Sequence, residues 1–272
     1  MKRILAGAVL LGGLIGCPAG AAVPIVKVGE IQSAQDCTAY VGWGGRLATQ
    51  CRAQFPDLRA NLQSMLLASG RIGLSSNVSG HDLPAPDLVV TGRVTGLGLT
   101  ASKASGPDYC VGGTRAVASL DLRVRDAHSG AILFGGNVTK SVALSSNIVA
   151  GGARCGTMTP DDASYDRVEG ALALVAARTV LFHVAPLRVT GISGRRIALN
   201  YGTPILTLGT IVQVTGAGGF PLRYQVVAAT AEAAFADPDG EAGPIAPGTL
   251  AQLIEEDDPA ANARRTERVE LP

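Results

Sequence analysis

The chain has 272 residues, of which 47% are hydrophobic, and a formal net charge of +1. A composition this apolar supports a folded core and argues against an intrinsically disordered chain. Because the charge is near zero and no long run of lysine or arginine occurs, we expect no nucleic-acid partner. Aromatic residues make up only 4%, so a carbohydrate-stacking surface is not expected either.

Residues 1–22 predict an export signal. Two basic residues precede an apolar run over residues 4–16, which is too short to span a bilayer but suits a signal-peptide core. Two cleavage routes remain open: residues 14–17 (LIGC) resemble a lipobox that would place a lipid on Cys17, and the small residues 19–22 suit ordinary signal peptidase. No later segment has the length and apolarity of a membrane span, so we expect membrane attachment only through a lipid on Cys17 or through a partner.

Four cysteines remain after either cleavage: Cys37, Cys51, Cys110 and Cys155. An even number in an exported chain predicts an oxidising compartment and two disulfides, for which three connectivities exist. Pairing of sequence neighbours is the simplest of these, and a Cys37–Cys51 bridge would contribute about 3 kcal/mol in the chain-entropy model. A metal site is the alternative; the lack of a CxxC pair and of a nearby histidine cluster disfavours it.

The first third of the chain predicts two strands and a helix. Alternating residues predict a strand over Ile25–Glu30. Apolar residues spaced by three and four predict a helix over Phe55–Ser69, and Gly70 suits a left-handed stop at its end. A β-branched run predicts an interior strand over Leu88–Val94.

The clearest strand pattern lies over Ala116–Arg125, where apolar and polar residues alternate, so that one face should be wet. Turn residues over 126–130 and a β-type run over 131–134 then predict a hairpin. The loops that carry Cys110 and Cys155 would leave the same end of that hairpin, which favours their pairing.

The rest of the chain predicts one more helix and a small β module. The helix should run from Ala163 to His183 and end before Pro186. Short strands separated by glycine and proline follow over 196–202, 208–214 and 224–227.

Several of these segments resemble a known family. The motifs are LLASGR at 66–71, PDLVVTGRVT at 86–95 and the hairpin 118–134 with its DxxSGxILF turn. In this order they resemble the curli-secretion CsgG family and the related TolB amino-terminal fold. Residues 197–202 and the later Pro-Gly at 247–248 look like the β module of flagellar assembly protein T.

The resemblance implies an envelope protein that builds or stabilises a larger assembly, with no catalytic residues to carry over. The connecting loops differ from those of the pore-forming members, because they are too short and too poor in alternating apolar residues for amphipathic membrane hairpins.

Four motifs could carry chemistry, and each has a plainer interpretation that we favour. The glycine-rich residues 42–45 around Trp43 lack the spacing of a nucleotide-binding loop and suit a turn. His128 suits an exposed turn rather than a catalytic base. The acids at 161–162 suit helix capping, and the acidic residues 237–241 lack the full calcium-loop pattern and suit a turn.

We therefore expect an α+β fold, a mixed sheet with packed helices, followed by a small all-β domain. The predicted organisation is a signal peptide over 1–22, an α+β domain over 23–187, a β domain over 188–254 and a polar tail over 255–272. The predicted function is non-catalytic: a periplasmic protein, able to attach to the outer membrane, that needs no cofactor and binds envelope proteins or copies of itself. A periplasmic small-ligand carrier and an envelope hydrolase are the alternatives, the latter disfavoured by the absence of a GxSxG motif.

Overall fold

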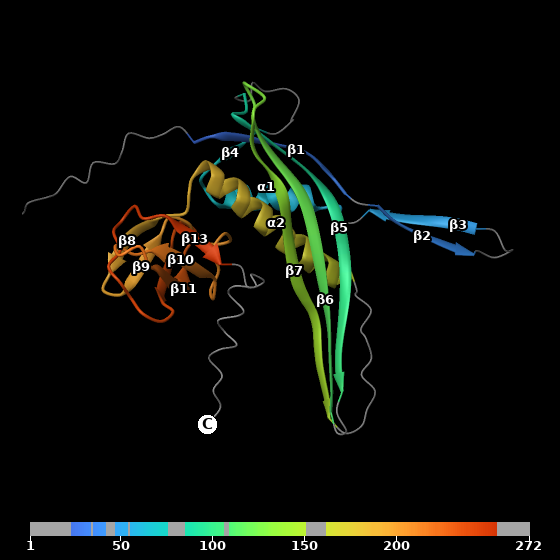
Figure 1. Ribbon diagram of the computed structural model, residues 1–272. Coiled ribbons are helices and arrows are strands. Elements are labelled where there is room, and N and C mark those ends of the chain that lie inside the picture. The colour runs from blue at the N-terminus through green and yellow to red at the C-terminus, as the bar shows by residue number, and fades with distance from the viewer. Residues whose placement is uncertain are drawn as a thin grey trace, which may run out of the picture.

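The computed structural model describes residues 23–33, 35–41, 47–53, 55–75, 85–105, 109–150 and 162–254. These residues contain two helices and thirteen strands, and the strands form three sheets (Figure 1). This confirms the expected α+β class. Cys17, Trp43, Asp161, Cys155 and the predicted tail lie outside the described residues.

The main sheet has five strands in the order β4-β1-β5-β6-β7. Strand β1 (Ile25–Gln32) runs parallel to β4 (Gly73–Leu74) and β5 (Leu88–Ser105). Strands β5, β6 (Tyr109–Asp126) and β7 (Ile132–Ala150) are consecutive and antiparallel. The sheet is therefore mixed, with long antiparallel hairpins on one side.

Both helices pack on one face of this sheet (Figure 1). Helix α1 (Leu58–Ala68) contacts β1 and β4, whereas α2 (Asp162–Val184) contacts β6, β7 and α1. Apolar side chains spaced by three and four on the helices meet the inward side chains of the strands. The fully buried members include Leu62, Leu66, Leu120, Leu122, Leu172 and Val180.

The second sheet has six strands in the order β13-β10-β11-β12-β9-β8. Its strands are β8 (Val189–Ser193), β9 (Arg196–Leu199), β10 (Ile211–Thr215), β11 (Pro221–Ala229), β12 (Ala234–Pro238) and β13 (Ala251–Ile254). A bridge between Arg188 and Leu250 brings the two ends of the sheet together, so the sheet curls on itself. A separate hairpin of β2 (Gln35–Val41) and β3 (Leu47–Ala53) forms the third sheet.

Buried polar contacts join the second sheet to the end of α2. The hydroxyl of Tyr201 donates to the carbonyl oxygen of Ala185 over 2.6 Å, and the guanidinium of Arg71 lies 5.6 Å from the Tyr201 ring centre. Burial raises the pKa of Tyr201 to about 12, so the phenol remains a hydrogen-bond donor. On α2 itself, the buried Arg178 donates through Nε to the carbonyl oxygen of Ile205 over 2.9 Å. These contacts attach the second sheet to the helix layer.

The structure confirms the predicted elements, but several are longer than the sequence pattern indicates. Gly70 has a φ of 63° after α1, as expected of a left-handed stop. The predicted strand over Leu88–Val94 was too short, because β5 continues to Ser105. The predicted hairpin was likewise too short, because β6 and β7 pair from the turn back to Tyr109 and Ala150. The expectation that short loops connect these strands was therefore wrong, because residues expected in loops belong to β5, β6 and β7.

Candidate functional site

No group of histidine, cysteine, aspartate and glutamate in the described part of the chain could hold a metal ion. Across the same residues, neither helix is long and apolar enough to cross a membrane. Two surface features of the described residues are candidates for binding: one face of the main sheet and a cleft beside β7.

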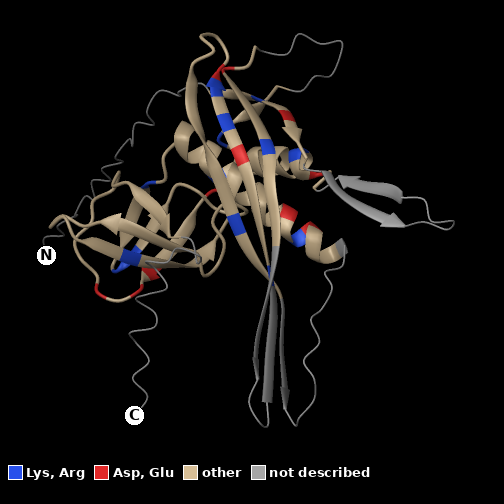
Figure 2. Cartoon of the chain, turned by 45° about the vertical axis from the view of Figure 1, so that its right-hand side comes forward, with Lys and Arg blue, Asp and Glu red and all other residues tan. Residues whose placement is uncertain are grey.

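The first feature is the face of the main sheet that the helices leave uncovered, which we call the open face. Alternation along the strands creates it: on β6, Leu120, Leu122 and Val124 are buried, whereas Arg123 and Arg125 between and beyond them are exposed. Figure 2 marks the positions of charged residues along the strands of this sheet. The open face consists of Lys27 on β1, Thr91, Arg93 and Thr95 on β5, Arg115, Ser119, Asp121, Arg123 and Arg125 on β6, and Asn137, Thr139 and Ser141 on β7.

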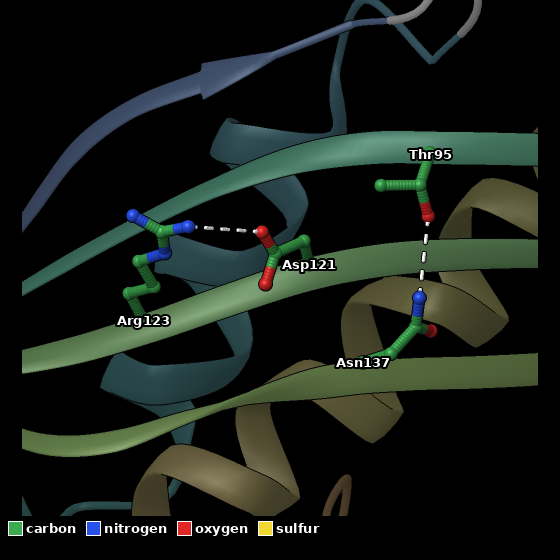
Figure 3. Close-up of polar contacts among 4 residues, drawn as sticks. All are labelled: Thr95, Asp121, Arg123 and Asn137. Carbon is green, nitrogen blue, oxygen red and sulfur yellow. Dashed lines mark hydrogen bonds and ion pairs between the residues drawn. The ribbon is translucent and has the colours of Figure 1, made fainter.

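Hydrogen bonds between side chains of different strands hold the open face in place. The amide of Asn137 donates to the hydroxyl of Thr95 over 3.3 Å, across the intervening strand β6 (Figure 3). Thr95 lies at the irregularity between Val94 and Gly96, where the pairing of β5 with β6 shifts. Hydroxyl groups of Ser119 and Thr139 lie 3.0 Å apart. This face is therefore an ordered polar surface.

The open face carries an excess of positive charge. Arg123 and Asp121 form an exposed ion pair with an N–O distance of 3.4 Å (Figure 3). Such a pair contributes little to stability, about 0–1 kcal/mol, because water screens both charges. The basic residues of the face are Lys27, Arg93, Arg115, Arg123 and Arg125. The acidic residues are Asp121 and the exposed Glu30 of β1. Because the basic residues outnumber them, the surface is complementary to an acidic partner.

The second feature is a cleft of about 270 Å³ beside β7, which we call the α2–β7 cleft. Helix α2 and strand β7 line one side, and the loop before β10 together with β13 lines the other. Its lining residues are Lys140, Ala171, Leu174, Val175, Arg178, Thr207, Leu208, Gly209, Thr210, Ile211, Leu253 and Ile254. The lining of the cleft thus combines apolar and polar side chains, and its two charged residues are both cations.

The cysteine predictions meet different outcomes. Cys37 on β2 and Cys51 on β3 lie directly opposite each other in the antiparallel register of the hairpin. Cys110 lies near the start of β6 opposite Val149, rather than in a loop. Because Cys155 is outside the described residues, its pairing with Cys110 stays a prediction, as does the lipidation of Cys17.

The turn interpretation suits only the first of the two motifs that the structure describes. At the β6–β7 turn, the Asp126 carboxylate accepts hydrogen bonds from the backbone and the hydroxyl of Ser129 and from the backbone of His128, and these hold the pKa of Asp126 below its usual value. Asp237 accepts two hydrogen bonds from Arg196, over 2.7 and 2.8 Å, which lower the pKa of Asp237. Asp237 lies on strand β12 opposite Gln225, so the turn interpretation was wrong for this residue.

Sequence reasoning found only part of these surfaces. It predicted the wet face of β6, but missed Thr95 and Asn137, which no local pattern marks as neighbours. It also missed the α2–β7 cleft, whose lining comes from four separate segments.

No family model matches this chain, and no curated protein matches it. Solved structures with partial similarity include a DUF330 protein from Xanthomonas campestris, with 13% identity over 61% of this chain and 89% of that chain, and a TM-score of 0.35. A minor lipoprotein from Acinetobacter baumannii has 11% identity over 60% of this chain and 95% of that chain, with a TM-score of 0.31.

TolB from Acinetobacter baumannii has 10% identity over 79% of this chain and 46% of that chain, with a TM-score of 0.29. TolB is one of the expected resemblances, whereas these three structures include neither a curli-secretion protein nor a flagellar assembly protein T. TM-scores this low carry no argument about family or function.

Proposed function

We propose that this chain is a non-catalytic, exported protein of the bacterial cell envelope that binds other envelope proteins. Its place would be the periplasm, with a lipid on Cys17 as a route to the outer membrane. Its role would be that of an assembly or accessory factor in a secretion, flagellar or cell-wall complex. The export signal and the resemblance described above support the compartment and the role.

The open face is the observation that carries the proposal. Its side chains stand on a continuous sheet and are linked by hydrogen bonds, so little ordering is needed when a partner binds. Arginine is enriched at protein interfaces, and Arg93 and Arg125 are exposed here. No ion pair involves either of these two arginines among the described residues. A flat, positively charged surface of this kind suits an acidic protein surface.

The test is crosslinking followed by affinity purification of the tagged full chain from the envelope of its host. Wild-type protein should retain a partner or form an oligomer. The double variant Arg93→Glu/Arg125→Glu should lose that complex, because both charges are reversed. The matched variant Arg93→Lys/Arg125→Lys keeps both charges and should retain most of it.

Each outcome bears on the proposal. If wild-type protein captures no envelope protein and does not oligomerise, the proposed function is wrong. If the charge-reversal variant captures the same partner as wild type, the open face is not the binding surface.

A further inference from the structure

The outer edge of β7 has no strand partner among the residues that the structure describes. Strand β7 pairs with β6 along its whole length and ends the order of the main sheet. Irregularities interrupt this pairing at both ends, but residues 134–143 keep a regular register. Such an edge offers unpaired backbone N–H and C=O groups to another extended chain.

Strand β7 has only part of the usual protection of an edge strand. Residues 134–143 contain no proline, and Lys140 is their one charged side chain. By alternation, Lys140 shares a face with Val138, which is buried against the helix layer. Lys140 accordingly lines the α2–β7 cleft.

The α2–β7 cleft lies beside this edge strand. Leu174 and Val175 of α2 and Ile211 and Leu253 of the second sheet contribute apolar walls. A strand added to β7 would therefore place alternate side chains in this cleft and the others on the open-face side.

We propose that β7 accepts an extended segment of a partner protein as an additional strand, whose inward side chains are apolar and acidic. The unpaired backbone selects an extended peptide, and alternate side-chain pockets give such complexes their specificity. The two charged residues that line the cleft, Lys140 and Arg178, are both cations, which favours a carboxylate over an ammonium group.

The size of the cleft supports a peptide over a small ligand. Its volume of about 270 Å³ lies below the range of about 300–1,000 Å³ usual for drug-sized ligands. It suits individual side chains of a strand whose main chain lies along β7. This site is separate from the open face, so either could bind a partner without the other.

The test uses the mature full chain and a short synthetic peptide with threonine at outward positions and valine, glutamate and valine at inward positions. Fluorescence anisotropy of the labelled peptide should show saturable binding. Amide hydrogen exchange within residues 134–143 should slow, because the amides that face away from β6 gain partners.

Two control peptides separate the contributions of backbone and charge. Replacing the glutamate with lysine should weaken binding about tenfold, and methylation of the pairing backbone nitrogens should abolish it. On the protein, Lys140→Glu should reverse the preference between the glutamate and lysine peptides. Arg59→Glu, at an exposed position of α1 outside both surfaces, should leave the binding of both peptides unchanged.

The proposal is overturned if the glutamate peptide does not bind, or if it binds without slower exchange in residues 134–143. Unchanged charge preference in Lys140→Glu would also overturn the placement of the acidic side chain. Since these measurements use no envelope partner, their failure is distinguishable from a failure of the open face.

Discussion

Glu169 on α2 is a buried carboxyl group whose ionisation should make the stability of the protein depend on pH. Its exposed fraction is 3%, and its Oε1 atom has no hydrogen-bond partner within the described part of the chain. Burial raises the pKa of Glu169 from its usual 4.5 to about 7, and the carboxylates of Asp57 and Asp166 add to the increase. A hydrogen bond from the backbone N–H of Asp57 opposes it.

The direction of the effect follows from where the protons are bound. Between pH 4.5 and pH 7, the folded protein keeps a proton on Glu169 that the unfolded chain has lost, so stability falls as the pH rises. The interval between the two pKa values, at about 1.4 kcal/mol per pH unit, sets a ceiling of about 3.4 kcal/mol above pH 7. Because local water access reduces such penalties, we expect a loss of about 1–2 kcal/mol.

Urea unfolding of the purified mature protein at several values between pH 4.5 and pH 8 measures this contribution. Glu169→Gln removes the ionisable group while keeping its shape, so its advantage over wild type should be small at the lowest pH and largest above pH 7. Glu232→Gln, at an exposed position in a loop of the second sheet, is the matched control and should follow wild type. Parallel stability curves for wild type and Glu169→Gln would refute the assigned titration.

Four further predictions concern the second sheet, helix α2 and the cysteines. Gly202→Ala should lower the free energy of unfolding by about 1–3 kcal/mol, because an added Cβ would overlap the backbone around residue 230. Gly170→Ala in α2 should instead stabilise the protein by up to about 1 kcal/mol in thermal melts, because its added Cβ meets no atom within 4 Å. Tyr201→Phe should cost about 1–2 kcal/mol in urea unfolding, since it removes a buried hydroxyl donor. Cys37 and Cys51 lie opposite each other, and opposed residues of an antiparallel pair have Cα atoms about 4.5–5.5 Å apart, which is within disulfide range. Non-reducing peptide mapping of the exported protein should therefore find Cys37 linked to Cys51. A free thiol at either cysteine would contradict this prediction.

The sequence predicted those parts of the fold in which a clear period coincides with burial on one side. On β6, Leu120 and Leu122 alternate with polar residues, and the structure buries them under α2. The outer halves of β5 and β7 were missed because residues 95–105 are rich in glycine, alanine and serine and residues 141–150 in alanine and serine, so that only short apolar alternations such as Leu97–Leu99 and Val142–Leu144 mark them. Their pairing depends on neighbouring strands, as the register from Leu88 to Ser105 against β6 shows.

The candidate site was harder to predict, because its features depend on contacts between distant segments. The pairing of Thr95 with Asn137 needs both the irregularity in β5 and the register of two strand pairs. Glu169 likewise reads as an ordinary polar residue of a helix. Its raised pKa arises first from burial in the folded protein, and the carboxylate of Asp57, just before α1, adds to it.

Both proposed binding surfaces depend on helix α2, but only the α2–β7 cleft also depends on the second sheet. Packing of α2 under β6 and β7 supports the open face from below. The α2–β7 cleft also needs the wall formed by residues such as Ile211, and contacts such as Tyr201 to the end of α2 hold that wall in place. Loosening the attachment of the second sheet should therefore weaken peptide binding at β7 while leaving capture by the open face intact, because the open face draws all its residues from the main sheet.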